Sequence, residues 1–447
     1  MAGRHRAAAN AAPATSLLLG VAFCAAGAGA AELDARALAL GGASVADGRG
    51  VHGVVSNPAS LAALRRTGVR ASFLLGAGAD LRDHDDVSSL LTDEQAQDVG
   101  EDLEDEIDRL SGSSITCDPT TDDDGTACLS GTRRLSTIAG DGLEIIDRVD
   151  EHEVSGDGAA RLGVAVTATA VPFALHVAGR GAARGEADIS DSDEAYVARL
   201  GAALEDDVLT LGEVRDNAVE FSIENETLDI TDPEDIVTST GEGGAMYRVQ
   251  FGASLATSVA VGGRALDVGV TPKLSRLRAW GTRPELVDAF DDTTPSLEDE
   301  FEDSETDESS FTFDAGVTTE LASLPVRVAA VLRNVVPESV RTPDGVEFET
   351  TPQLVVGLAH RRGRLGLTAD AALNEARLDG IPTQALGVGA EFGNATFALR
   401  GGLGADLGRA DDAVALTLGA KLGPLELGGR LSGPETGQFA AQISFGF

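Results

Sequence analysis

The residues best suited to chemistry are two cysteines that flank an acidic run. Cys117 and Cys128 enclose Asp118-Pro-Thr-Thr-Asp-Asp-Asp124. Two closely spaced cysteines in an exported chain are typical of a disulfide, whereas carboxylate oxygens are ligands that Ca²⁺ prefers. The run lacks the alternating ligand spacing and the distant bidentate glutamate of an EF-hand. We therefore expect a Cys117–Cys128 disulfide that closes a solvated loop, with calcium binding as the alternative.

Catalytic patterns do not emerge from the remaining polar residues. No two histidines stand at the spacing of a metal site, and the sequence has no G-x-S-x-G, H-E-x-x-H or Walker glycine motif. The acidic pairs lie in runs that offer no apolar pocket to shift a pKa. We expect no metal, no cofactor and no enzymatic activity. The histidines considered are His5, His52, His84, His152, His176 and His360.

Composition and charge narrow the classes of partner. The 447 residues carry a formal net charge of −39, which argues against nucleic acid because phosphates need a basic surface. Hydrophobic residues make up 43%, too many for a disordered acidic chain, yet aromatic residues make up only 4% and there are 54 glycines. Small apolar residues of this kind suit closely packed strands.

The first 30 residues have the pattern of a secretory signal. Arg4 and Arg6 form a basic start, 17–26 form an apolar stretch, and Ala28-Gly29-Ala30 matches a cleavage site. The alternatives are a short membrane anchor, for which the apolar stretch is short, and a lipoprotein modified at Cys24, for which Phe23 fits the motif badly. We expect export and cleavage.

Apolar residues recur with a period of two from residue 69 to the C-terminus. In the last segment Phe439 and Ile443 alternate with Gln438 and Gln442, and the same pattern recurs upstream. One face is large and apolar and the other is small or polar, in segments near the ~10 residues that a tilted strand needs to cross a bilayer. This pattern predicts an all-β fold, an antiparallel transmembrane β-barrel. We expect fourteen strands: 69–80, 161–171, 173–184, 245–258, 265–280, 310–319, 326–335, 351–361, 364–374, 384–392, 395–405, 412–421, 425–431 and 438–447.

Acidic insertions interrupt the barrel pattern at 80–157, 188–242 and 285–309. Residues 285–309 contain twelve acidic residues and no basic one, and Leu103, Ile107 and Leu110 have helical spacing in the first insertion. We expect partly helical loops whose charges gather in water because lipid excludes them. Their role is solvation, with a cation trap as the alternative.

Two further segments suggest how the barrel is built and closed. Phe445 and Phe447 end the last strand on its apolar face, which is typical of an assembly signal read by the barrel-assembly machinery; a packed terminus of a soluble protein is the alternative. Gly41 and Gly42 begin a glycine-rich stretch that ends at Asn57-Pro58. Irregular backbone is tolerated at membrane depth when protein shields it, so we expect residues 31–66 to form a hatch or plug inside a barrel of 67–447, although an ordinary linker is the alternative.

Several motifs, taken in order, resemble a known family. Residues 37–47 and 56–62 look like the N-terminal signature of FadL-type barrels, and they also resemble the exported TraF-like family of conjugal transfer proteins. The C-terminal half strengthens the second resemblance, through Val270-Thr-Pro-Lys273, Phe313-Asp-Ala-Gly316, Val331-Leu-Arg-Asn334 and residues 387–392. The resemblance implies a fourteen-stranded barrel with a hatch near Asn57-Pro58.

The expected function is that of a plugged outer-membrane barrel. It would serve envelope transport of small apolar molecules or a conjugation-associated envelope role, with outer-membrane lipid, the assembly machinery and a small apolar ligand as partners. Ser56 stands where such proteins often have an aromatic residue, which weakens the analogy with a fatty-acid channel. The alternatives are a non-transporting structural barrel whose acidic loops bind a partner, and a secreted soluble β-protein.

Cleavage at the end of the Ala28-Gly29-Ala30 motif should give a mature chain that begins at Ala31 or Glu32. Intact-mass spectrometry of the protein from the cell envelope measures this directly. A chain that retains Met1, or one that carries lipid on Cys24, would contradict the expectation of a simple signal peptide.

Overall fold

The computed structural model describes most of the chain, and the barrel strands almost completely. The described residues are 34–48, 50–66, 71–82, 106, 109–111, 113–118, 122–149, 153–167, 171–203, 208–216, 221–224, 227–230, 238–283, 304–321, 325–394, 396–408, 414–432 and 437–446. The expected signal peptide and Phe447 lie outside them. None of the described helices is long and apolar enough to cross a membrane.

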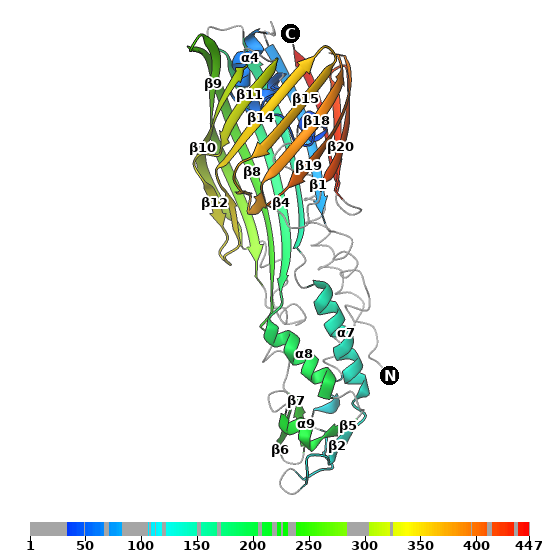
Figure 1. The fold of residues 1–447 in the computed structure, drawn as a ribbon. Coiled ribbons are helices and arrows are strands. Elements are labelled where there is room, and N and C mark those ends of the chain that lie inside the picture. The colour runs from blue at the N-terminus through cyan, green and yellow to red at the C-terminus, as the bar shows by residue number, and fades with distance from the viewer. Residues whose placement is uncertain are drawn as a thin grey trace, which may run out of the picture.

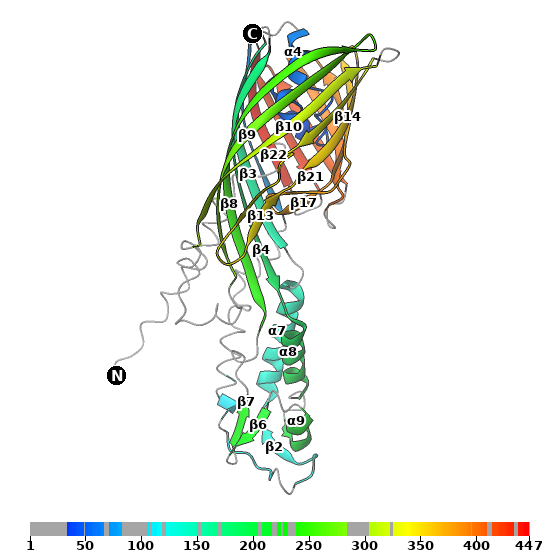
Figure 2. The ribbon, with the colours of Figure 1, turned by 90° about the vertical axis from the view of Figure 1, so that its left-hand side faces the viewer.

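Fourteen antiparallel strands form a closed barrel, as the sequence predicts (Figures 1 and 2). The ring closes because β1 pairs with β22 on one side and with β3 on the other. The barrel strands are β1 (Ala71–Arg82), β3 (Glu153–Val166), β4 (Phe173–Asp188), β8 (Thr240–Val261), β9 (Arg264–Thr282), β10 (Thr306–Glu320), β11 (Val326–Arg333), β14 (Gln353–Arg362), β15 (Leu365–Ala372), β18 (Ala385–Gly393), β19 (Phe397–Asp406), β20 (Ala415–Leu422), β21 (Leu425–Leu431) and β22 (Gly437–Gly446).

The alternation of side chains decides which face of the wall meets lipid. On β20, Leu416 and Leu418 are exposed on the outside whereas Thr417, between them, is fully buried inside. On β22, Phe439 and Phe445 face outward while Gln438 and Gln442 are buried inside. The outer surface is therefore apolar and the inner surface is small or polar, which is the arrangement of a barrel that spans a bilayer.

The two ends of the barrel differ in the length of their connections. Near the C-terminus the strands are joined by short turns, among them Gly262-Gly263 between β8 and β9 and Gly423 between β20 and β21, all with positive φ. At the opposite end the connections carry all the insertions. We call the end that carries these long connections the outer end.

Several strands run further into the acidic segments than the sequence indicated. β3 begins at Glu153, β8 at Thr240 and β10 at Thr306, each of them inside an expected insertion. Their polar ends lie beyond the apolar band, where water accepts the charges, so the backbone ladder continues although the apolar alternation has stopped. The insertions are correspondingly shorter than 80–157, 188–242 and 285–309.

Residues from the first two insertions fold together into a small lobe at the outer end (Figure 1). Helix α7 (Arg133–Val149) packs on α8 (Asp191–Ala203), and buried Leu110, Leu135, Tyr196, Leu209 and Val214 form its core. The elements that complete the lobe are β2 (Ala127–Ser130), β5 (Val208–Thr210), α9 (Leu211–Asp216), β6 (Phe221–Glu224) and β7 (Thr227–Ile230). These acidic segments are therefore partly a folded unit, where the sequence suggested solvating loops.

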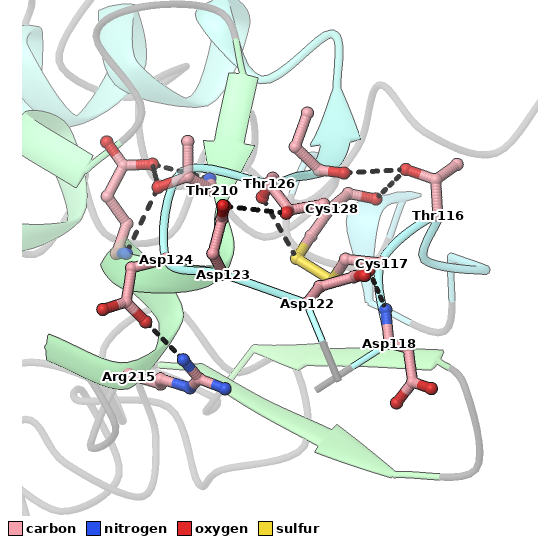
Figure 3. The surroundings of a disulfide bond; sticks show 12 residues. Thr116, Cys117, Asp118, Asp122, Asp123, Asp124, Thr126, Cys128, Thr210 and Arg215 are labelled. Atoms are coloured by element: carbon pink, nitrogen blue, oxygen red, sulfur yellow. Dashed lines mark hydrogen bonds and ion pairs between the residues drawn. A yellow bond between two sulfur atoms is a disulfide. The ribbon is translucent and has the colours of Figure 1, made fainter. Parts of the chain in front are cut away.

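A disulfide lies at the far end of this lobe (Figure 3). Cys117 and Cys128 are bonded, with their Cα atoms 4.6 Å apart, and they pack against Leu211 of α9. Asp122 and Asp123 turn back to accept hydrogen bonds from their own loop, and Asp124 pairs with Arg215. In the described residues of the chain no group of three potential metal ligands is found.

Asp193 connects the lobe to the barrel. Its carboxylate accepts hydrogen bonds from the backbone N–H groups of Thr238 and Ser239, at 2.8 and 2.6 Å, just before β8 begins. Burial opposes ionisation of Asp193, but these bonds and those from the Ser239 and Ser190 hydroxyls outweigh it and hold its pKa below the usual value. The resulting stabilisation is complete at neutral pH and is lost as the pH falls through the folded-state pKa.

The packing of α7 on α8 predicts a new cross-link. A Cβ atom at Gly201 would lie 3.5 Å from the Cβ of Ala139, which falls in the range that a disulfide requires. The double variant Ala139→Cys/Gly201→Cys should therefore oxidise spontaneously, and peptide mass mapping should recover a 139–201 cross-link. The matched control is Thr137→Cys/Gly201→Cys. Thr137 lies on the exposed side of α7, so these two cysteines should stay reduced. Two free thiols in the first variant would contradict this packing.

Candidate functional site

The N-terminal segment 34–66 lies inside the barrel and contacts its wall on nearly all sides (Figure 2). It contains the short helices α2 (Ala35–Leu38), α3 (Gly50–Ser56) and α4 (Ser60–Arg66). α2 contacts β20, β21 and β22, α3 contacts β1, β3 and β22, and α4 contacts β8 and β9. We call residues 34–66 the hatch, which is the region in which the sequence predicted irregular backbone inside the lumen.

Glycines in the wall let the hatch backbone approach closely. A Cβ atom at Gly387 would lie 2.1 Å from the carbonyl oxygen of Gly41, and one at Gly389 would lie 2.7 Å from the backbone of Leu40. Gly41 and Gly42 themselves have φ values of +73° and +90°, which residues with a side chain adopt at a cost. Glycines on both the wall and the hatch thus allow their backbones to pack directly against each other.

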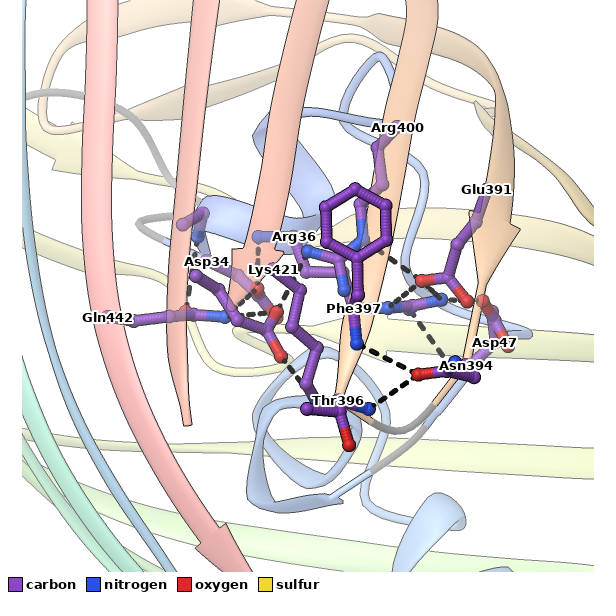
Figure 4. Close-up of polar contacts among 12 residues, drawn as sticks. Asp34, Arg36, Asp47, Glu391, Asn394, Thr396, Phe397, Arg400, Lys421 and Gln442 are labelled. Atoms are coloured by element: carbon purple, nitrogen blue, oxygen red, sulfur yellow. Dashed lines mark hydrogen bonds and ion pairs between the residues drawn. The ribbon is translucent and has the colours of Figure 1, made fainter. Parts of the chain in front are cut away.

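Ion pairs fix the first turn of the hatch to one half of the wall (Figure 4). Arg36 lies between Asp47 of the hatch and Glu391 of β18, and the Glu391 carboxylate also accepts a 2.9 Å hydrogen bond from Arg400 of β19. Asp34 accepts a hydrogen bond from the amide of Gln442 on β22. Arg36, Glu391 and Arg400 are buried, and each of these charges lies close to an opposite charge, as burial of ions requires.

Asp370 of β15 holds the middle of the hatch. Its Oδ2 accepts hydrogen bonds from the backbone N–H groups of Ser44 and Val45, at 2.6 and 2.7 Å. Such bonds to a charged acceptor are stronger than those between neutral groups. They satisfy backbone donors that have no regular structure to pair with inside the barrel.

Asn57 is completely buried where the hatch meets β10. Its Nδ2 donates to the carbonyl oxygens of Val45 and Val317 and to the Thr318 hydroxyl, while its Oδ1 accepts from the backbone N–H of Ala59. The amide therefore pins two parts of the hatch to each other and to the wall. Pro58 follows it and lies against Gly269 of β9. Beyond it, Val54, Leu61 and Leu64 form an apolar cluster with Leu74 of β1.

Two hairpins enter the barrel mouth at the outer end. The first consists of β12 (Glu338–Arg341) and β13 (Glu347–Thr350), and its Val340, Val346 and Phe348 pack on inward residues of β4, β8 and β9. The second consists of β16 (Ala376–Leu378) and β17 (Ile381–Thr383), which turn through Asp379 and Gly380 at positive φ. Positive φ at both central residues is what a tight hairpin turn of this type requires.

A cavity of about 130 Å³ remains between the hatch and the hairpins. The hatch contributes Val55 and Ser56, and the second hairpin contributes Arg377 and Leu378. Most of the lining consists of polar and charged side chains that point inward from neighbouring strands. These wall residues include Arg161, His176, Arg180, Arg248, Gln250, Lys273, Asp314, Arg333, Asn334 and Gln353.

The structure distributes the residues singled out in the sequence among three places. It brings Gly41, Gly42, Asn57 and Pro58 together in the hatch, and it places the disulfide in the lobe. Phe445 faces outward on β22 opposite Phe73 of β1. Sequence reasoning missed the charged residues on the inner wall. Their signal was available, because each occupies the inward position of an apolar strand, where a charge has to be paired or functional.

A closed barrel with an apolar outer surface and a segment of its own chain folded inside has the architecture of a β-barrel that spans a membrane. The chain belongs to the family described as "F plasmid transfer operon, TraF, protein", whose model matches residues 54–371.

Comparison with solved structures adds more distant similarities. The chain is 14% identical to the toluene transporter TbuX of Ralstonia pickettii, with a TM-score of 0.44 over 94% of this chain and 98% of that one. It is 12% identical to the toluene transporter TodX of Pseudomonas putida, with a TM-score of 0.44 over 92% and 96%. No curated protein matches the sequence significantly.

Adding one methyl group under the hatch should loosen it. In Gly269→Ala the new Cβ would lie 2.4 Å from the backbone of Pro58, so hatch and wall have to separate, at a cost of about 1–3 kcal/mol. We expect faster proteolysis within residues 34–66 of the assembled barrel. The matched control is Gly401→Ala, whose Cβ meets only ordinary contacts at 3.7 Å. Equal protection of the two variants would show that the hatch does not rest on Gly269.

Proposed function

We propose that this protein is a channel of the outer membrane that the hatch keeps closed and that passes small molecules when the hatch moves. One observation carries the proposal: residues 34–66 cross the lumen and contact inward positions on both halves of the wall. A segment that only led to β1 would need none of these contacts. The fourteen strands around it would otherwise enclose a lumen wide enough for a solute.

The way in which the hatch is held supports movement without unfolding of the barrel. Its first half is fixed by ion pairs and hydrogen bonds, such as those of Arg36 and Asp370, together with small apolar clusters that Leu38 and Val45 form with the wall. Water can replace polar contacts of this kind when a hatch leaves the wall, so the exchange costs less than exposure of an apolar core. Strand pairing in the barrel does not include any hatch residue.

The proposed channel implies an orientation in the membrane and a route of export. The C-terminus and the short turns would face the periplasm, and the lobe would face the exterior. This topology requires that the chain leave the cytoplasm by way of the N-terminal signal and reach the assembly machinery, with Phe445 and Phe447 as its recognition signal. A small apolar molecule remains the cargo expected from the sequence, but the charged lining of the cavity favours polar cargo.

A second function is favoured by the lobe. It has its own buried core and a disulfide, and it stands beyond the outer end of the barrel (Figure 1). We propose that it binds a partner at the cell surface, in agreement with the plasmid-transfer wording of the family description. A variant without α7 and α8 should then lose partner binding or mating efficiency while its channel properties stay unchanged.

Removal of residues 34–66 tests the channel function. We expect the wild-type barrel to conduct ions poorly in planar bilayers, because the hatch fills the lumen. The deletion variant should form a stable open pore, because the segment that fills the lumen is gone. Heat-modifiable gel mobility shows whether each protein has assembled. A variant that lacks the β6–β7 hairpin of the lobe is the control and should conduct like the wild type. An assembled deletion variant that stays closed would refute the proposal.

A further inference from the structure

We propose that the lumen cavity is a binding site for a small organic anion, a molecule of about the size of benzoate whose carboxylate or similar oxyanion is the recognised group. The inference rests on the proposed channel function and names the chemical class of its cargo. Its position supports this role, since any solute that passes between the hairpins and the hatch enters the cavity. Its volume of about 130 Å³ is close to the ~150 Å³ of cavities known to hold benzene.

Six basic residues surround the cavity, in a chain whose formal net charge is −39. Five of them occupy inward positions on β3, β4, β8, β9 and β11, which follow one another around the ring with β10 between the last two. The sixth, Arg377, comes from the second hairpin. The residues are Arg161, Arg180, Arg248, Lys273, Arg333 and Arg377. A basic cluster against the charge of the whole protein is not a by-product of composition.

Fewer acidic than basic residues lie at the cavity in the described part of the chain. Asp34 and Asp314 line it, and Asp379 and Glu338 form ion pairs with Arg180 and Arg248. An excess of positive charge in a narrow, partly desolvated space attracts an anion and repels a cation. A bound anion would offset it.

The acidic residues also hold the basic groups in fixed positions. Lys273 Nζ is 2.6 Å from an Asp314 carboxylate oxygen and donates to Asn334 Oδ1 at 3.1 Å. Asp379 is fully buried between the guanidinium groups of Arg180 and Arg248. Long basic side chains that are already ordered lose little conformational entropy when a ligand binds.

His176 supplies a neutral group in the same wall. It is 95% buried, its ring lies over Gly252, and its Nδ1 has no hydrogen-bond partner in the described structure although it is shielded from bulk water. A buried polar atom left without a partner costs free energy, and an oxyanion in the cavity can accept a hydrogen bond from the ring N–H. The amides of Gln250 and Gln353 add further donors.

Binding to the complete, assembled protein tests the site. Benzoate, benzamide, toluene and inorganic phosphate are titrated into the barrel in neutral detergent at low ionic strength, with micelle-matched blanks, and affinity is measured by calorimetry or saturation-transfer NMR. Benzoate should bind at least about tenfold more tightly than its neutral isostere benzamide, because a charge-assisted contact is lost in the amide. Competition by phosphate would identify the oxyanion alone as the recognised group, and its failure would show that the organic body contributes.

Variants that remove charges inside or outside the cavity show whether benzoate binds to this site or responds only to the overall charge of the protein. Arg161→Gln/Arg377→Gln should weaken benzoate binding by about tenfold or more. Arg377→Gln alone, a change on an exposed hairpin side chain, should weaken it by a smaller factor without affecting assembly. The control Arg276→Gln/Arg341→Gln removes the same charge from the exposed outer end and should leave affinity unchanged.

Three results would overturn the inference: benzamide or toluene binding as tightly as benzoate, equal affinity of the cavity and control variants, or no binding of any anion. None of them touches the hatch proposal, because the conductance of the hatch deletion variant is measured without a ligand. A barrel that binds benzoate but stays closed after the deletion would instead keep the site and refute the channel.

Discussion

The satisfaction of backbone hydrogen bonds in lipid is the constraint from which the rest of this structure follows. A chain that crosses a bilayer with strands has to close its sheet, because an open edge would leave unpaired N–H and C=O groups in hydrocarbon. Closure of β1 on both β22 and β3 meets this requirement. It then divides every strand into an outward set that has to be apolar and an inward set that is free to be small, polar or charged. The hatch and the cavity are both built on that inward set.

The inward-facing residues of the wall serve two purposes. Around β18 to β22 it combines glycines with the buried charges of Glu391 and Arg400, and there it binds the first turns of the hatch. Around β3 to β11 it carries basic side chains and leaves space. Apolar contacts of α3 and α4 with β1 and β8 close the rest. One sector of the sheet thus binds the hatch, and another lines the cavity.

The sequence predicted the barrel well because alternation with period two is a local signal. All fourteen expected strands occur, from residues near 69–80 to 438–447, since each pattern of large and small residues reports the lipid directly. The strand ends were less accurate, as for β3 at Glu153, because a strand in water no longer needs apolar alternation. The lobe was missed although Leu135, Ile138 and Ala139 of α7 have helical spacing, since the acidic composition of the insertions dominated the interpretation. The hatch partners of Asp370 and Glu391 could not be predicted at all, because they are more than 300 residues away in the sequence and depend on the closure of the ring.

The position of Asp379 bears on how cargo could enter the lumen while the hatch stays in place. It occupies the tip of the β16–β17 hairpin, yet its carboxylate is buried between Arg180 and Arg248 of the wall. The hairpin is therefore held to the wall by the same guanidinium groups that line the cavity. An anion that arrives there competes with Asp379 for its partners, whereas the hatch is held elsewhere, by Arg36 and Asp370. Because the hairpin and the hatch are held by separate contacts, cargo that displaces the hairpin leaves the contacts of the hatch intact, and the hatch keeps the lumen closed.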